Sequence, residues 1–167
     1  KKNLNTNYFF LNKKMKEKLV VKYIYDPLIK KPHFKSNSIF INDKNKLNAL
    51  KKKINFFVVC IGGEFGKSRY LISSKLEKKG LKPIGIVNKF SIIDDSVIIG
   101  KGVQILPNVT INCHSKIGDY CIINTSSTID HECTIGNGVH VMGGASIAGK
   151  VKIGNFVSIG TNATILP

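Results

Sequence analysis

The chain has 167 residues, 43% of them hydrophobic, so it is long enough to bury a core and corresponds to one or two small domains. Four cysteines and no tryptophan argue against a disulfide-stabilised secreted module and against an aromatic carbohydrate-binding face. The sequence has no signal-like N-terminus and no run of about 18 apolar residues. We therefore expect a cytoplasmic protein without a membrane span.

The formal net charge of +16 comes from the first half of the chain. Residues 1–90 contain 22 lysines and arginines against 5 acidic residues, whereas residues 91–167 contain 4 against 5. The basic side chains alternate with Asn and Ile, as is typical of surface positions that are free to drift. Attraction of a phosphorylated small ligand remains an alternative reading. Nucleic acid is not expected as a partner.

Residues 1–90 are predicted to form a small α/β domain. Residues 19–25 are a possible strand that ends at Asp26-Pro27, while residues 1–18 and 28–50 show no firm period. The apolar run 54–61, closed by Gly62-Gly63, predicts a buried strand, and residues 83–87 predict another. A helix between them would end at Gly80. Its side chains at three- or four-residue spacing are Phe65, Arg69, Ile72 and Leu76.

Residues 91–167 repeat every six residues. One β-branched aliphatic residue recurs thirteen times without exception, at Ile93, Ile99, Ile105, Ile111, Ile117, Ile123, Ile129, Ile135, Val141, Ile147, Ile153, Ile159 and Ile165. A small side chain stands two residues before each of them, and Gly, Asn or Asp often follows directly. The period predicts a parallel β-helix with three hexads per coil, in which residues eighteen apart stack.

In this β-helix, the repeated Ile and Val side chains fill the interior. We expect Gly, Asn and Asp one position later to adopt the unusual backbone angles of the corners. The sequence given stops at Ile165-Leu166-Pro167, in an apolar coil, so we expect a further segment or a partner to cover that end.

Several short motifs go beyond the bare hexad pattern. They are Asn124-Thr125, Asp130-His131-Glu132-Cys133, Val139-His140 and Gly149-Lys150. With the preceding α/β segment, they resemble the sugar acetyltransferases of bacterial surface-glycan pathways, which include UDP-4-amino-sugar N-acetyltransferases and sialic acid O-acetyltransferases. The resemblance implies a mainly β fold: a left-handed parallel β-helix preceded by a small, partial Rossmann-like α/β domain that binds the acceptor sugar.

The resemblance also implies acetyl-coenzyme A as donor, a homotrimer with its active site between neighbouring β-helices, and no metal. It implies a role for each matching residue: His131 as catalytic base, Glu132 as its acidic neighbour, Asn124 facing the acceptor, and His140, Gly149 and Thr161 contacting acetyl-coenzyme A. The predicted reaction is transfer of an acetyl group to an amino or hydroxyl group of a nucleotide-linked sugar.

The chemistry of His131 can be argued from the residues alone. Acetyl transfer from a thioester needs a base that takes the acceptor's proton, and imidazole is the usual choice near neutrality. A nearby carboxylate such as Glu132 favours the imidazolium that forms. His131 follows the inward Ile129 by two residues, so it should point outward at a corner. His114 is interpreted as a plain surface residue.

The chain departs from the resembled family in the α/β segment. Relatives begin with a strand and a Gly-rich turn that holds the nucleotide diphosphate, and no such turn precedes residue 54. Gly62-Gly63 matches the family's second Gly turn, and Asp26 matches the acidic end of its second strand. We therefore assign Asp26 and Gly62 to acceptor binding and expect a weakened nucleotide site.

Three alternatives stay open from the sequence. The first is a non-catalytic β-helix subunit that partners a full-length paralogue. The second is a β-helix zinc hydratase, which would need His114, His131 and His140 to converge at a subunit interface. The third is a nucleophilic pair of Cys113 and His131, although direct transfer needs no covalent intermediate.

Overall fold

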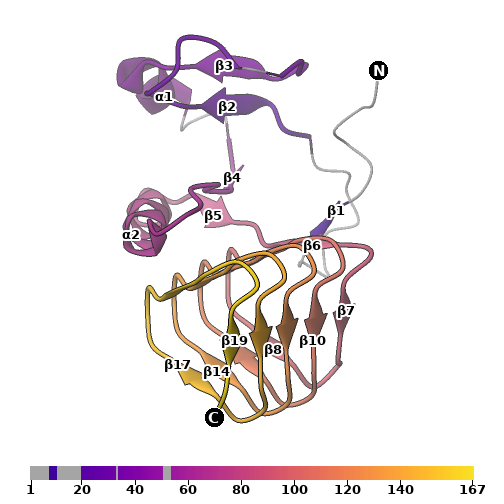
Figure 1. The fold of residues 1–167 in the computed structure, drawn as a ribbon. Helices are drawn as coiled ribbons and strands as arrows, with labels where there is room; N and C mark the ends of the chain where they lie inside the picture. The colour runs from indigo at the N-terminus through magenta and orange to yellow at the C-terminus, as the bar shows by residue number, and fades with distance from the viewer. Residues whose placement is uncertain (1–7, 11–19, 33, 51–53) are drawn as a thin grey trace.

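The computed structural model describes residues 8–10, 20–32, 34–50 and 54–167. A parallel β-helix forms its C-terminal part, and two smaller groups of elements precede it (Figure 1). The predicted fold class is thus confirmed for the β-helix. Among the described residues, no helix is long and apolar enough to cross a membrane.

The β-helix has three faces, each a parallel sheet of two- or three-residue strands. The first face contains β6 (Ile86–Asn88), β9 (Gln104–Ile105), β12 (Ile122–Ile123), β15 (His140–Val141) and β18 (Ser158–Ile159). The second contains β7 (Ile92–Ile93), β10 (Thr110–Ile111), β13 (Thr128–Ile129), β16 (Ser146–Ile147) and β19 (Thr164–Ile165). The third contains β8 (Ile98–Ile99), β11 (Lys116–Ile117), β14 (Thr134–Ile135) and β17 (Lys152–Ile153).

Each strand pairs with the strand one coil away in the predicted register. Thr110 pairs with Thr128 and Ile111 with Ile129, eighteen residues apart, and the other faces follow the same rule. The repeated Ile and Val side chains, together with the small residues that precede them, form one continuous buried core. Because each coil stacks directly on the last, residues eighteen apart become neighbours on the outer surface.

The corners differ from the prediction in one respect. Positive φ angles occur three residues after the inward Ile or Val from Ile99 to Ile159, for example at His114, Glu132 and Lys150, and not at the Gly, Asn or Asp that follows it directly. At Gly100, Gly118 and Gly136, close stacking on the next coil explains the glycine instead. A Cβ added to Gly118 would lie 2.6 Å from the carbonyl carbon of Gly136 in the next coil.

A strand–helix–strand unit precedes the β-helix, as predicted, with shorter strands. The strand β4 (Phe56–Phe57) pairs in parallel with β5 (Lys82–Pro83), and α2 (Gly66–Glu77) connects them. Gly80 follows α2 with φ of +84°, consistent with its predicted place after the helix. The single strand expected over 83–87 is two strands: β5 belongs to this unit, whereas β6 pairs with β9 in the β-helix.

Upstream elements are only partly those expected. The strand β2 (Tyr23–Tyr25) ends directly before Asp26, residues 20–22 of the predicted strand are not in a strand, and residue 19 lies outside the described residues. It pairs in parallel with β3 (Ile39–Ile41), which α1 (Lys44–Leu50) follows. The strand β1 (Tyr8–Phe10) pairs antiparallel with β6 at the edge of the first face. Sequence reasoning missed β1, β3 and α1.

The helix α2 packs on the β-helix with a face that the sequence did not predict. Its buried residues are Gly66, Arg69 and Ser73, while Phe65, just before the helix, and Ile72 are exposed. Gly66 allows the close approach, because a Cβ there would lie 2.1 Å from the carbonyl oxygen of Gly138. Of the four side chains whose spacing predicted the helix, Arg69 is the fully buried one, so the helix is held by backbone contact and by a buried guanidinium.

Candidate active site

His131 and Glu132 lie at the corner between the second and third faces, directly after β13. The Nδ1 atom of His131 lies 3.0 Å from Oε2 of Glu132, and the His131 side chain is 45% exposed. The hydrogen bond with His131 lowers the pKa of Glu132, and the charge of Lys150 lowers it further. Since a carboxylate can only accept, Nδ1 carries the hydrogen and Nε2 keeps a lone pair that can take a proton.

The preceding coil fixes the backbone of this corner. Asn112 donates its side-chain N–H to Asp130 at 2.9 Å, and the same carboxylate oxygen accepts the backbone N–H of His131 at 2.8 Å. These bonds lower the pKa of Asp130, so it stays ionised. The backbone N–H of Glu132 donates to the Cys113 carbonyl at 2.9 Å. The pair is therefore held on a rigid edge.

The following coil supports the two side chains from the other side. The His131 ring lies over Gly149, where an added Cβ would be 2.5 Å from Nε2 and 2.7 Å from Cε1. Lys150 donates its backbone N–H to the His131 carbonyl at 2.8 Å, and its Nζ lies 3.7 Å from Oε2 of Glu132. Gly149 thus lies beside the basic nitrogen, which only a residue without a side chain permits.

A second group of predicted residues lies on the first face. His140 is buried, with Nδ1 at 3.1 Å from the Gly63 carbonyl oxygen and Nε2 at 3.3 Å from Nδ2 of Asn124. A Cβ on Gly62 would lie 3.8 Å from the His140 ring, which is ordinary contact. Burial lowers the pKa of His140. The structure therefore brings Asn124, His140 and the Gly62-Gly63 turn together.

The remaining predicted residues join neither group. Thr161 is exposed after β18, and Asp26 accepts the backbone N–H of Leu28 at 2.8 Å in a turn after β2. His114 is exposed on the same corner as Glu132. His140 lies on the first face instead, so the three histidines of the zinc alternative do not converge within one chain. No group of three potential metal-ligating side chains occurs among residues with a described placement.

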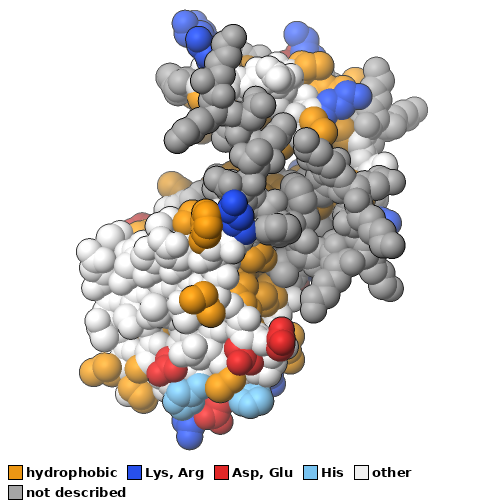
Figure 2. Space-filling view, turned by 90° about the vertical axis from the view of Figure 1, so that its right-hand side faces the viewer, with side chains coloured by type: hydrophobic (Ala, Val, Ile, Leu, Met, Phe, Trp, Pro, Cys, Tyr) orange, Lys and Arg blue, Asp and Glu red, His pale blue; other side chains and the backbone are white. Residues whose placement is uncertain are grey.

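The two groups lie on different sides of the molecule. The α/β unit packs along the first face, whereas His131 lies at the corner opposite that face, between the second and third. In Figure 2, histidine and acidic side chains gather at the lower edge of the β-helix, away from the upper part of the chain. The contacts of the α/β unit and the His131 corner therefore lie on different sides of the β-helix.

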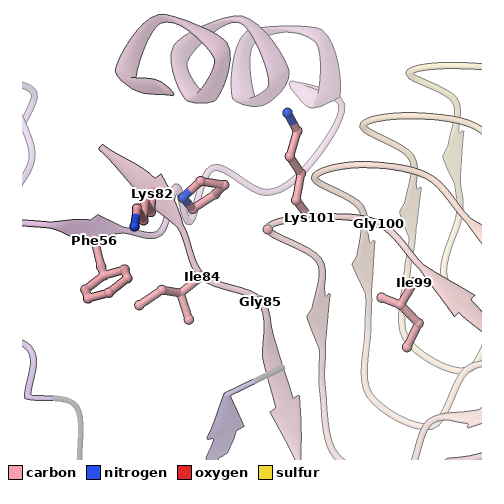
Figure 3. Close-up of a pocket in the computed structure, with 9 residues that line it drawn as sticks. Phe56, Lys82, Ile84, Gly85, Ile99, Gly100 and Lys101 are labelled. Carbon is pink, nitrogen blue, oxygen red and sulfur yellow. The ribbon is translucent and has the colours of Figure 1, made fainter. Parts of the chain in front are cut away.

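The pocket in Figure 3 is separate from both groups. It has a volume of about 400 Å³ and lies between β5 and the first coils of the β-helix. Phe56 and Ile84 form its apolar side, and Lys101 extends toward α2, where its Nζ lies 2.8 Å from Oε1 of Glu77. None of the predicted site residues lines it.

Sequence reasoning missed the supporting residues of the His131 corner. Asn112 lies eighteen residues before Asp130, and Lys150 lies eighteen residues after Glu132. The stacking rule derived from the hexads would have found both, had it been applied to the outward side chains as well as to the core. Arg69 was used only as one of the spaced residues that predicted the helix, and no signal in the sequence indicated its contacts with the β-helix.

The hexad repeats of the β-helix match a known family model. The family model "Bacterial transferase hexapeptide (six repeats)" matches residues 89–131 and 132–167. These residues belong to that family, and the predicted family of hexapeptide-repeat sugar acetyltransferases is confirmed. No curated protein matches the chain significantly.

Solved structures resemble a larger part of the chain. The acetyltransferase domain of PglB from Neisseria gonorrhoeae, in complex with acetyl coenzyme A, is 26% identical over 82% of this chain and 66% of that one, with a TM-score of 0.70. WeeI from Acinetobacter baumannii is 27% identical over 85% of this chain and 65% of that one, with a TM-score of 0.71. This chain thus spans about two thirds of the length of these two structures.

A third structure shows the same fold at lower identity. Perosamine N-acetyltransferase from Caulobacter crescentus, in complex with CoA and GDP-perosamine, is 24% identical over 77% of this chain and 69% of that one, with a TM-score of 0.63. At this identity the likeness concerns the fold alone.

Proposed function

We propose that this chain is an acetyl-coenzyme A-dependent acetyltransferase that modifies the amino group of a nucleotide-linked sugar, with His131 as general base. The observation that carries the proposal is the His131–Glu132 pair, whose geometry leaves Nε2 as a proton acceptor at an exposed corner. The matched PglB domain supports the donor, since that structure holds acetyl coenzyme A.

Acetyl-coenzyme A supplies the activated acetyl group as a thioester. His131 Nε2 takes the proton from the acceptor nitrogen as that nitrogen forms a bond to the acetyl carbon, and the bond from carbon to sulfur breaks. Glu132 holds Nδ1–H and stabilises the imidazolium. The proton then passes from Nε2 to the leaving thiolate, which gives free coenzyme A and an acetylated sugar.

A direct assay tests this function. Purified full chain is incubated with acetyl-coenzyme A and either GDP-perosamine or a UDP-linked 4-amino sugar, and products are followed by mass spectrometry. Acetylation of either sugar supports the proposal. Two results would contradict the proposal and favour the non-catalytic subunit. One is cleavage of the thioester without acetylation of the sugar, and the other is no turnover with either acceptor.

We further propose that the active site lies between neighbouring subunits of a homotrimer. The position of His131 on the corner opposite the first face supports this, because the α/β unit that would hold the acceptor packs along that face. Light scattering at micromolar concentrations should give three times the mass of one chain. A mass that remains at one chain across this range would contradict a shared site.

The absence of a side chain at Gly149 should matter for catalysis. Gly149→Ala would place a Cβ 2.5 Å from His131 Nε2 and force the ring to move. We expect turnover to fall about 10- to 100-fold, since displacing a reacting group by about 1 Å has effects of that size. Gly154→Ala is the matched control, because nothing lies within 4 Å of a Cβ there. Equal turnover of the two variants would show that Gly149 leaves the ring unaffected.

Nucleotide binding should be weak and sensitive to salt. The lysines and arginines of residues 1–90 attract a diphosphate diffusely, and such attraction is screened more readily than a nest of backbone amides. Calorimetric titration with UDP at two salt concentrations measures this. The affinity for UDP should drop markedly at the higher salt concentration. Tight binding of UDP that does not depend on salt would reveal a formed phosphate site and refute the expectation.

A further inference from the structure

A serine hydroxyl is built into the turn that carries His131 and Glu132. Ser115 lies one coil earlier at the same corner and is fully buried. Its Oγ donates to the backbone carbonyl of Asp130 at 2.7 Å and accepts the backbone N–H of Cys133 at 3.0 Å. These two backbone groups lie on either side of the His131–Glu132 pair in the chain, so one hydroxyl bridges the two ends of the turn.

The turn at the same corner of the first coil is closed in a different way. There the backbone N–H of Val97 donates directly to the carbonyl of Asp94 at 3.1 Å. At the His131 corner the corresponding N–H, that of Cys133, donates to the serine hydroxyl instead. The Ser115 side chain thus takes the place of a direct hydrogen bond across the turn, in addition to filling the core.

The bridge lies in a part of the core that has no contact with water. Both Ser115 and Cys133 have 0% exposed surface. A hydroxyl can donate one hydrogen bond and accept others, so Ser115 satisfies a carbonyl and an N–H at once. Without the hydroxyl both backbone groups lose this partner, and unpaired polar groups in a buried site are costly. The turn would then rearrange to pair them, and His131 would move with it.

We infer that Ser115 is a positioning residue for the His131–Glu132 pair: its hydroxyl sets the shape of the turn from Asp130 to Cys133 and thereby the direction of the His131 ring. This inference rests on the proposed function, in which Nε2 of His131 takes the acceptor's proton. Because Ser115 is buried, it touches neither substrate. Its effect is therefore expected on the chemical step and not on binding.

Three variants of the full chain separate the hydroxyl of Ser115 from the size of its side chain. Ser115→Thr keeps the hydroxyl, Ser115→Val has the shape of threonine without it, and Ser115→Ala removes it without adding volume. Valine suits this position, because Val97 and Val151 occupy it in other coils of the same corner.

The variants are assayed with acetyl-coenzyme A and with GDP-perosamine or a UDP-linked 4-amino sugar. Ser115→Val and Ser115→Ala should lower kcat about tenfold, as expected for a small displacement of a reacting group, with the KM values for donor and acceptor unchanged. Ser115→Thr should keep most of the kcat, since its hydroxyl can make the same two hydrogen bonds.

Ser91→Ala is the matched control. Ser91 occupies the same hexad position at another corner, and its hydroxyl donates to the Asn88 carbonyl of its own turn, so kcat should stay near that of the unmodified chain. If Ser115→Val and Ser115→Ala kept the unmodified kcat, the inference would be wrong. A Ser115→Thr variant that lost as much kcat as Ser115→Val would overturn it as well, because side-chain size would then matter and not the hydroxyl.

The position of the His131 ring can also be followed without any substrate. In ¹H–¹³C spectra, the ring signals of His131 should shift in Ser115→Val and Ser115→Ala and stay in place in Ser115→Thr. The ring signals of His140, on the first face, should stay in place in all three variants. Unchanged His131 signals in the two variants without a hydroxyl would overturn the inference whatever the enzyme does. If the signals move as expected but the unmodified chain acetylates no acceptor, the proposed function fails on its own.

Discussion

His131→Ala should lower turnover about 10²- to 10⁴-fold, the usual contribution of a positioned general base. The variant removes Nε2, which is the nitrogen left free by the hydrogen bond between Nδ1 and Glu132. Affinity for acetyl-coenzyme A should change little, because the lost group acts on the acceptor's proton. Glu132→Gln should cost less, since the base remains and only its ionic partner is lost. Steady-state kinetics and calorimetry measure both effects.

His114→Ala is the matched control for this experiment. It removes another exposed histidine from the same edge of the β-helix, one coil before Glu132, and should leave turnover near that of the unmodified chain. If His131→Ala retained most of its turnover, or if the two histidine variants lost equal activity, the role assigned to His131 would be wrong.

Arg69→Met should cause the largest loss of stability. The Arg69 side chain is fully buried and donates to the carbonyl oxygens of Tyr120, Ile61 and Gly138 at 2.7, 2.6 and 2.9 Å. Methionine has a similar length but no donor, so these carbonyls lose that partner in a buried site. Each orphaned group costs about 1–3 kcal/mol, and we expect the free energy of unfolding to fall by about 3 kcal/mol or more.

Urea unfolding of the full chain measures this effect, with Lys67→Met as control. Lys67 is exposed on the same helix, so its replacement should change the free energy of unfolding by no more than about 0.5 kcal/mol. A similarly small change in Arg69→Met would mean that the guanidinium does not hold α2 on the β-helix.

The β-helix could be predicted from the sequence because its core repeats. Each hexad contributes one inward β-branched residue, so a single period fixes the strands, the register and the stacking of residues eighteen apart. The corners were predicted less well. Glycines such as Gly118 were interpreted as residues with unusual φ angles, but contact between coils explains them, and residues such as Glu132 carry the positive φ.

The α/β segment could not be predicted as far, because its packing depends on single contacts. The helix α2 was found from its spacing and from Gly80, yet its buried side follows from Gly66 against Gly138 and from Arg69. Neither the Gly66 contact nor the buried Arg69 belongs to a repeat in the sequence, so no fixed spacing could predict them. The short strands β3 and β4 gain their pairing from distant partners, which local propensity does not reveal.

The candidate site was identified from its motif, while its construction required the structure. The pair of His131 and Glu132 lies side by side as expected, and Gly149 lies against the His131 ring. His140 was expected at the donor because it projects from the β-helix. The sequence could not show that the Gly63 turn covers it, since that contact joins residues from two different parts of the fold.

A crystal structure of the full chain with coenzyme A tests the central claim most directly. The account predicts a trimer with the donor between two β-helices, its sulfur beside His131 Nε2 of one chain, and the acceptor turn at Gly62-Gly63 supplied by a neighbouring chain. Coenzyme A bound within one chain, away from the His131 corner, would contradict the shared active site and the catalytic role of that corner.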